Sequence, residues 1–375
     1  MNFGFTEEQE LLRAEVRKFL DEQCPIPEVR RIMETPEGHS PELWKQLAEL
    51  GWLGLIIPEQ YGGAGLEWSD LVVLLEETGR TLFPSPLIST TLAATAILEA
   101  GSEAQRARWL PGLADGSRIG TLAILEESDL LAREGIQLRG EPAGRDFRLS
   151  GQKRFVADAT QADLFVLAFR SGDGEAELSL AVLDGDAPGL EAEGFATLDQ
   201  TKRLGTLWLE GVRVAEDAVL GTPGAAWPAI SRLLSSGAVA VTAESIGACE
   251  AALALTVQYA KDRIQFGAPI GHFQGVKHPL AEAHVDIECM KSLAYYAAWA
   301  LDTSPDEVAL ASSRAKGFAS EACSRIGVTG IQLHGAVGFT QEYDIQLYLK
   351  RSKWARPAFG DEDHHYDRVA TLGGV

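Results

Sequence analysis

The stretch 263–278 combines residue types that can hold an anionic, planar ligand. It contains Arg263, two glutamines and two aromatic residues, Phe266 and Phe273. An arginine presents a planar fork of donors that matches a pyrophosphate, glutamine amides add polar anchors, and a phenylalanine ring offers a stacking face. A helix–helix corner with a solvated arginine has the same composition. The residues alone leave both interpretations open.

Two long helical patterns flank this stretch and must position it. Apolar residues recur at helical spacing over 246–259 and again over 280–301. Between these patterns, glycines and Pro269 interrupt the helical rhythm. The sequence therefore predicts a tight turn between two long helices.

The chain has 375 residues, which is enough for two or three domains with substantial cores. Its hydrophobic fraction of 46% is ordinary for a globular protein. The formal net charge of −21 argues against nucleic acid or an anionic membrane surface as the main partner. We interpret the acidic balance as a solubility feature.

The four cysteines form no Cys-x-x-Cys pair, and we expect buried free thiols in a reducing cytoplasm. They are Cys24, Cys249, Cys289 and Cys323. The first residues lack a basic region followed by an apolar run, so we expect no signal peptide. No uncharged run reaches the roughly 18 apolar residues that span a bilayer. The expected location is cytoplasmic.

The first hundred or so residues have a helical pattern. Thr6 followed by acidic residues and Gln9 is a helix-start signal, and Pro25 and Pro27 are expected to end that helix. Further helices are predicted over 41–50, 69–82 and 87–100. The glycine-rich run 62–65 neither follows a strand nor opens onto a Gly-Lys-Thr sequence, so we interpret it as a turn.

The character of the chain changes at 111–116, and short β-branched runs bounded by Gly and Asp follow. Candidate strands are 119–125, 147–149, 164–169, 178–182 and 206–209. From Trp227 to Tyr348 the pattern is helical again, with Ala-rich segments longer than twenty residues. Helices of that length predict a bundle in which small residues permit close packing.

Three motifs carry a family resemblance. They are Arg-x-Gln-Phe-Gly-x-Pro-Ile-x-x-Phe-Gln-x-x-Lys-His at 263–278, Gln-Leu-His-Gly-Ala-Val-Gly-Phe-Thr-Gln-Glu-Tyr at 332–343, and Gly-Trp-Leu-Gly-Leu-Ile-Ile-Pro-Glu-Gln-Tyr-Gly-Gly-Ala-Gly at 51–65. In order and spacing they resemble the acyl-CoA dehydrogenase family over essentially the whole chain. The resemblance implies an N-terminal α-helical domain (1–115), a middle antiparallel β domain (116–222) and a C-terminal α-helical bundle (223–375).

The resemblance also implies a reaction. In this family a carboxylate removes the α-proton of an acyl-CoA thioester, and FAD takes a hydride from the β-carbon. The flavin lies between the β domain and the C-terminal helices of one subunit, while a second subunit holds its pyrophosphate and adenine. Electrons then pass to an acceptor such as an electron-transfer flavoprotein.

The half-site that a subunit donates to its neighbour's FAD is retained by resemblance, although Ala336 replaces a second glycine. Its residues are Arg263, Phe266, Phe273, Gln274, Gln332 and Gly335.

The half that a subunit supplies to its own flavin is degraded. Leu125 replaces a threonine that donates to the flavin ring, and Ala157 has lost a second hydroxyl. Phe155 remains able to stack.

The general base is missing from both positions that the family uses. These positions are Phe359 and Gly237, and the Asp and Arg that help to hold substrate are Ser235 and Ala238. Asp361 is a weak candidate for a replacement base within an acidic turn. We expect His364 and His365 to be a surface pair and expect no metal site, because a ligand cluster at the right spacing is lacking.

One segment bears on the subtype. Residues 197–204 resemble a segment of bacterial relatives that act on steroid side-chain CoA thioesters, many of which pair a catalytic subunit with a degenerate one. The favoured hypothesis is the base-lacking subunit of such a heteromeric enzyme. A self-sufficient homotetrameric flavoenzyme, dehydrogenase or oxidase, that uses Asp361 or a neighbour as base is an alternative. A flavin-free CoA-ester-binding scaffold is another.

Overall fold

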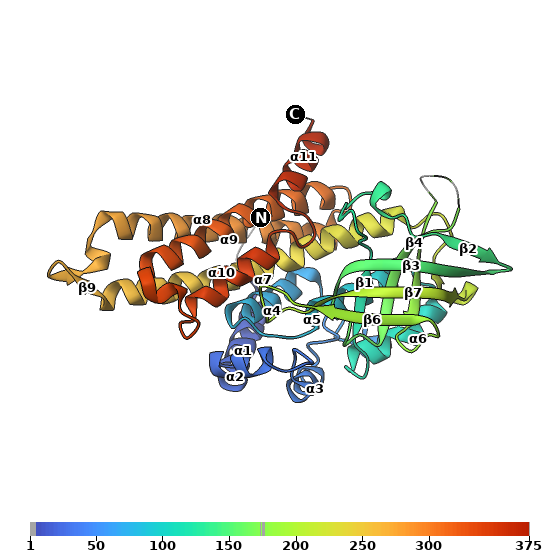
Figure 1. Ribbon diagram of the computed structural model, residues 1–375, viewed down its shortest axis with the longest axis horizontal. Helices are drawn as coiled ribbons and strands as arrows, with labels where there is room; N and C mark the ends of the chain where they lie inside the picture. Colours follow the sequence, from blue (N-terminus) through green and yellow to red (C-terminus); the bar gives the residue numbers. More distant parts are fainter. Residues whose placement is uncertain (1–4, 173, 175–176, 375) are drawn as a thin grey trace. The chain divides into compact units, whose positions relative to one another are not determined.

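The computed structural model describes residues 5–172, 174 and 177–374. The chain forms two compact units. The first unit comprises Met1–Arg31, Trp68–Phe83 and Ala238–Val375, and the second comprises Ile32–Glu67 and Pro84–Gly237. Figure 1 labels the helices and strands of both units. The three-domain division with boundaries at 115 and 222 stays a prediction.

The first unit is built from helices. They are α1 (Glu7–Gln23), the start of α2 (Ile26–Met33), α4 (Trp68–Arg80), α7 (Trp227–Asp262, in this unit from Ala238), α8 (Gln274–Thr303), α9 (Val308–His334), α10 (Ile345–Ala355) and α11 (Glu362–Gly373). Helix α9 packs against α8, α10 and α11, and α4 packs against α1 and α8. Figure 1 shows α8 and α9 running side by side. The predicted helical bundle is confirmed.

Helices α4 and α7 approach closely because each contributes a glycine to the contact. A Cβ atom on Gly79 would lie 1.8 Å from the carbonyl oxygen of Glu244, and a Cβ atom on Gly247 would lie 1.8 Å from that of Glu76. Any larger side chain at either position would push the helices apart. The expected role of small residues at the seams is confirmed here.

The second unit carries two four-stranded sheets. Its strands are β1 (Gly120–Ala123), β2 (Gly140–Ala143), β3 (Asp146–Ala157), β4 (Leu164–Arg170), β5 (Leu178–Asp184), β6 (Leu190–Phe195), β7 (Leu204–Val214) and β8 (Val219–Leu220). The sheet orders are β1-β4-β5-β8 and β2-β3-β7-β6. Pairing is antiparallel except between β1 and β4, which are parallel.

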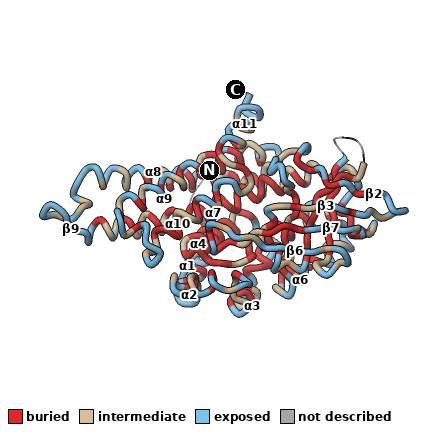
Figure 2. Tube along the Cα trace, in the orientation of Figure 1, coloured by how far each residue is buried: buried red, intermediate tan, exposed pale blue. Residues whose placement is uncertain are grey.

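The inner faces of the two sheets form one hydrophobic core. Leu149, Leu167, Leu207 and Val212 are among its buried members, and all seven residues of β4 are buried. Figure 2 shows this buried band along the strands. The helices of this unit are α3 (Pro41–Glu49), α5 (Leu87–Ala100) and α6 (Glu103–Ala114), and α5 packs against β1. The expected antiparallel β domain is confirmed.

Short 3-10 turns complete the chain. They are η1 (Glu59–Tyr61), η2 (Arg133–Gly135), η3 (Glu216–Ala218), η4 (Ile270–His272) and η5 (Gly335–Phe339). The glycine-rich run after η1 is a turn, as predicted. A Cβ atom on Gly63 would lie 2.0 Å from the carbonyl oxygen of Ile57, so the backbone itself fills the space that a phosphate cradle would need.

Helix ends were predicted best where a capping signal exists. Thr6 and Gln9 form a capping box at the start of α1, and α5 spans the predicted range. Helix α1 ends at Gln23, just before Pro25, as predicted. Helix α2, which begins at Ile26 and carries Pro27 in its first turn, was missed, because a proline is tolerated there. Helix α6, which contains Pro111, was also missed.

Two strands were missed for a common reason. Strand β2 contains Gly140 and Pro142, and β6 carries Glu191 and Glu193 with no fully buried residue. Both lie at the edges of their sheet, where polar residues and proline are tolerated. The β-branched, apolar pattern that identifies a strand is therefore absent from them.

Helix α7 is, among the described residues, the one helix long and apolar enough to cross a membrane by length and composition. Of its most apolar window, 72% is buried inside the protein, as in the core helix of a globular protein. All four cysteines are free thiols. Burial is confirmed for three of them and is wrong for Cys289, which is exposed.

Candidate cofactor site

The predicted turn after α7 is a short β-hairpin. Strand β9 (Ile264–Gln265) pairs with β10 (Ala268–Pro269), and the two residues between them have φ angles of +54° for Phe266 and +80° for Gly267. Glycine suits such a turn, but phenylalanine adopts a positive φ at a cost. The ring of Phe266 is 94% exposed. An exposed aromatic ring held in a strained turn indicates a ligand or a partner.

Arg263 stands where α7 passes into this hairpin. Its N–H donates to the carbonyl of Tyr259 at 2.8 Å, and its own carbonyl accepts from Ile270 N–H at 2.8 Å. The side chain is exposed, and within the described part of the chain its guanidinium forms no ion pair. The backbone is therefore fixed while the charged group stays available for an anion.

Phe273 and Gln274 follow at the start of α8. The rings of Phe266 and Phe273 meet edge to face, with centroids 6.1 Å apart. Phe273 is the N-cap residue and has no side-chain oxygen, so no side chain caps the first turn of α8. Gln274 is exposed. This end of α8 presents backbone donors and an amide beside the aromatic pair.

The second predicted segment lies at the end of α9. Gln332 is exposed, and Gly335 ends the helix with a φ of +65°. A Cβ atom on Gly335 would meet nothing within 4 Å, so the glycine is needed for its backbone angle and leaves an open surface.

Tyr259 joins the two segments. Its carbonyl accepts from Arg263, and its phenol donates to the carbonyl of His334 at 3.2 Å. Its ring stacks on the His334 imidazole with centroids 4.4 Å apart. The His334 ring is held in turn by a 2.7 Å contact between Nδ1 and the carbonyl of Gly330. The structure therefore brings the Arg263 hairpin and the Gln332–Gly335 segment together.

Replacing Tyr259 by Phe should loosen this link without removing the ring. One hydrogen bond contributes about 0.5–1.5 kcal/mol, so FAD affinity of the assembled protein should fall about three- to tenfold. Tyr343→Phe is the matched control, because the Tyr343 ring also packs against His334, with centroids 5.0 Å apart. Fluorescence titration with FAD measures both. Equal affinities for the two variants would contradict the role assigned to the Tyr259 hydroxyl.

The residues predicted to serve the chain's own flavin lie in the second unit, Leu125 just after β1 and Phe155 and Ala157 at the end of β3. Phe155 has a φ of +54°, is 38% exposed, and lies edge to face with Phe195 at 6.1 Å. The carbonyl of Leu125 accepts from Arg154 N–H at 2.9 Å, and that of Ala157 accepts from the Thr121 hydroxyl at 2.6 Å. Two side-chain hydroxyls are missing here, while the stacking ring is present.

A buried ion pair holds this part of the sheet. Lys153 is fully buried, and its ammonium lies 2.7 Å from Glu126 and 3.0 Å from the carbonyl of Ile124. Burial lowers the pKa of Lys153 to about 8, against the attraction of Glu126. Glu126 also accepts from the backbone N–H of Leu138 at 2.9 Å. The strand ends around Phe155 are therefore rigidly placed.

The position expected for the base lies in the turn between α10 and α11. Phe359 occupies it with a φ of +57°. Lys316 of α9 donates to the carbonyls of Arg356 at 2.9 Å and Gly360 at 2.7 Å, and His365 Nε2 lies 2.9 Å from the carbonyl of Phe359. Burial lowers the pKa of Lys316 to about 7. Two buried basic side chains thus hold a turn that presents no carboxylate at 359.

The nearby acidic residues are engaged in local structure. Asp361 is the N-cap of α11 and accepts from His364 N–H at 3.0 Å. Glu362 is buried and paired with Arg356, which corrects the expectation of a solvated acidic turn. The expected surface histidine pair is wrong for His365, which is 4% exposed. Burial and the charge of Lys316 lower the pKa of His365 to about 3, so its imidazole is neutral at pH 7.

Sequence reasoning missed Lys316 and Tyr259, and it placed His365 wrongly at the surface. Lys316 could have been noticed in the sequence, because it is a lone lysine inside an Ala-rich helical pattern. A lysine that is buried in such a helix needs hydrogen-bond or charge partners. Tyr259 carries no such signal, because the carbonyl that its hydroxyl contacts belongs to His334, 75 residues away in the sequence. Gly237, Ser235 and Ala238 lie within α7, as the helical pattern there predicts.

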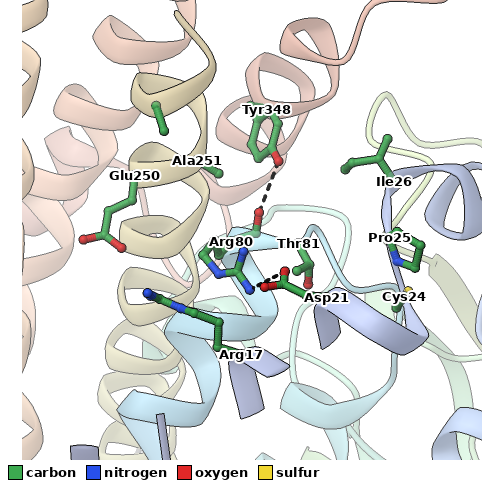
Figure 3. A pocket seen from close by; sticks show the side chains of 11 residues that line it. Arg17, Asp21, Cys24, Pro25, Ile26, Arg80, Thr81, Glu250, Ala251 and Tyr348 are labelled. Atoms are coloured by element: carbon green, nitrogen blue, oxygen red, sulfur yellow. Dashed lines mark hydrogen bonds and ion pairs between the residues drawn. The ribbon is translucent and has the colours of Figure 1, made fainter. Parts of the chain in front are cut away.

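A separate open groove of about 480 Å³ lies in the first unit (Figure 3). Arg17 and Arg80 line it, but both pair with Glu77, and Arg80 also bonds Asp21 at 2.8 Å. Tyr348 donates to the carbonyl of Arg80 at 3.1 Å. The charges cancel locally, and none of the predicted cofactor residues lines the groove.

Comparison with known proteins gives consistent matches. Residues 6–117 match the model of the acyl-CoA dehydrogenase N-terminal domain, and residues 224–372 match that of the acyl-CoA dehydrogenase C-terminal domain. The acyl-CoA dehydrogenase IpdE2 of Mycolicibacterium smegmatis is 34% identical over 356 residues, which cover 95% of each chain.

Two solved structures are similar along their full length. A variant of the Tcur3481-Tcur3483 steroid ACAD is 33% identical with a TM-score of 0.89, and the match covers 98% of each chain. The ChsE4-ChsE5 complex from Mycobacterium tuberculosis is 26% identical with a TM-score of 0.91, and the match covers 100% of this chain and 99% of that one.

Proposed function

The chain belongs to the acyl-CoA dehydrogenase family, oxidoreductases that act on CH–CH bonds with FAD as cofactor, and from this premise we propose that it is the base-lacking subunit of a heteromeric enzyme. In this role it completes the FAD site of a second acyl-CoA dehydrogenase-like subunit. Its own half-site is degenerate and contributes little to catalysis.

The contrast between two parts of the first unit carries the proposal. The segments around Arg263 and Gly335 are linked by Tyr259 and present their polar and aromatic groups outward. The turn that should carry the base instead presents Phe359, and Asp361 is engaged as the N-cap of α11. A chain that keeps the half-site for its neighbour's FAD but lacks the base would fit together with a subunit that supplies the base.

The described residues fit FAD as a ligand brought by a neighbour. Arg263 would pair with the pyrophosphate, since a guanidinium that has no ion-pair partner among the described residues favours a charge-assisted contact with phosphate oxygens. Phe266 and Phe273 would cover apolar parts of the cofactor, and Gln274 and Gln332 would supply amides. When bound, FAD accepts the hydride from the β-carbon of the substrate. This chain's residues bind and orient it.

The substrate class follows from similarity. Relatives include a protein described as a steroid ACAD, so we propose an acyl-CoA with a bulky, ring-bearing acyl group. The segment 197–204 is weaker support for this substrate class than its resemblance to steroid-side-chain enzymes suggests. Arg203 donates to the carbonyls of Met33 at 2.9 Å and Thr35 at 2.7 Å, which is a structural role inside the second unit. An electron-transfer flavoprotein as acceptor and a cytoplasmic location remain part of the proposal.

Flavin content of the chain purified alone tests the proposal. We expect little or no FAD, because Leu125 and Ala157 offer no side-chain donor and, by family analogy, Arg263 serves the flavin of a neighbour. Co-purification with a second dehydrogenase subunit should give a yellow complex. About one FAD per chain in the isolated protein would instead identify a self-sufficient flavoenzyme. A colourless complex would identify a flavin-free scaffold.

A further inference from the structure

Two buried cysteines face each other between α7 and α9. The Sγ atoms of Cys249 and Cys323 lie 3.2 Å apart, and the residues are 74 apart in sequence. Both side chains are buried, at 5% and 4% exposure. The two other thiols differ. Cys24 is buried, and burial raises its pKa to about 12, while Cys289 is exposed.

The pair is chemically asymmetric. The Cys249 thiol donates to Cys323 Sγ, which lowers the pKa of Cys323 and raises that of Cys249. Burial opposes the Cys323 thiolate, while Ser245 and the positive charge of Lys316 favour it. The thiolate is the form that attacks an oxidant or a disulfide. Cys323 is therefore the nucleophile of the pair, and Cys249 is the thiol placed to resolve its oxidised form.

The two sulfurs border a cavity of about 10 Å³. Small residues such as Ala248 and Gly327 line it together with the larger side chains of Ile326, Tyr348 and Arg351. That volume is close to the smallest that holds one water molecule. A small oxidant reaches the pair only when the helices fluctuate, so oxidation should take minutes to hours. A disulfide needs a sulfur–sulfur distance near 2.05 Å, an approach of about 1.2 Å from the present separation.

We propose that Cys249 and Cys323 are a redox-active dithiol that hydrogen peroxide converts into a disulfide joining α7 to α9. The Cys323 thiolate attacks one peroxide oxygen, the O–O bond breaks, and water leaves after protonation, which gives a sulfenic acid on Cys323. The Cys249 sulfur then attacks the Cys323 sulfur, the S–O bond breaks, and a second water leaves. Both thiol sulfurs are oxidised and one peroxide is reduced to two waters.

The disulfide would tie together the two helices whose ends carry Arg263 and Gln332. Cross-linked residues far apart in sequence restrict the unfolded chain, so the oxidised protein should resist heat better. Disulfides in reducing compartments are mostly transient and redox-sensing. The proposed disulfide does not depend on flavin, so its test is independent of the test of the proposed function.

The test uses the full-length chain, oxidised with hydrogen peroxide at pH 7, alkylated under denaturing conditions and mapped by mass spectrometry. We expect a cross-linked peptide pair that contains Cys249 and Cys323, with Cys24 alkylated as a free thiol, and reversal by dithiothreitol. The thermal midpoint should rise by about 3–5 °C on oxidation.

Matched variants separate the pair from the other thiols. Cys249→Ser should abolish both the cross-link and the rise in midpoint, while Cys289→Ser should keep both. If Cys249→Ser does not fold, peptide mapping of the wild-type chain is sufficient to test the proposal. The proposal is overturned if oxidised wild-type protein carries both cysteines as free thiols, or if Cys323 proceeds to sulfinic acid with Cys249 still alkylated.

Discussion

Arg263→Ala should empty the assembled complex of FAD while leaving the subunit folded. Losing a bidentate, partly buried arginine–phosphate contact costs about 2–5 kcal/mol, which weakens binding by roughly 30-fold or more. The side chain is exposed and forms no ion pair within the described residues, so its removal should not disturb the helical unit. Flavin absorbance per complex after gel filtration, with circular dichroism as the folding control, measures the effect.

Two further variants sharpen this experiment. Arg263→Lys should recover only part of the affinity, because lysine lacks the planar fork. Lys261→Ala removes an exposed positive charge two residues away, at the end of α7, and should leave flavin occupancy unchanged. If Arg263→Ala kept full occupancy and wild-type affinity, Arg263 would be an ordinary surface charge and the two-chain site would be wrong.

The isolated chain should not reduce flavin with any acyl-CoA at an appreciable rate. General-base catalysis contributes about 10²- to 10⁴-fold, and both base positions, Phe359 and Gly237, lack a carboxylate. Phe359→Glu should restore little by itself. The turn would present a carboxylate, but Leu125 and Ala157 still lack the hydroxyls that the family uses on the flavin ring.

Anaerobic reduction of added FAD, followed at the flavin absorbance band with an acyl-CoA in excess, checks this expectation. Asp361→Asn is the diagnostic variant, since its amide oxygen can still accept from His364 N–H and keep the cap of α11. Steady turnover by the wild-type chain that Asp361→Asn abolishes would favour a self-sufficient enzyme. Turnover that survives the substitution would point to a base elsewhere.

Family motifs made much of the fold predictable. The stretch 263–278 predicted a tight turn between two helices, and the hairpin between α7 and α8 confirms it. The capping box at Thr6 and the helix at Leu87–Ala100 were predicted from local signals. These features depend on short-range sequence, where propensity and pattern act directly.

The missed features depend on contacts between distant residues. Nothing near Lys316 reveals that its ammonium holds the carbonyls of Arg356 and Gly360. The positive φ of Phe266 is set by the two-residue hairpin and not by the preference of phenylalanine. Strand β6 lies at the edge of its sheet and pairs only with β7, so exposed glutamates are tolerated along it. Local patterns cannot encode such arrangements.

The number of FAD molecules bound per chain tests the central claim most directly. FAD is titrated into an equimolar mixture of this chain and its co-purified second subunit, and bound flavin is counted against total protein. We propose that one half-site in this chain is intact and the other degenerate, so we expect saturation at one FAD per two chains and almost no FAD with this chain alone. Saturation at one FAD per chain, in the mixture and in the isolated chain alike, would contradict it.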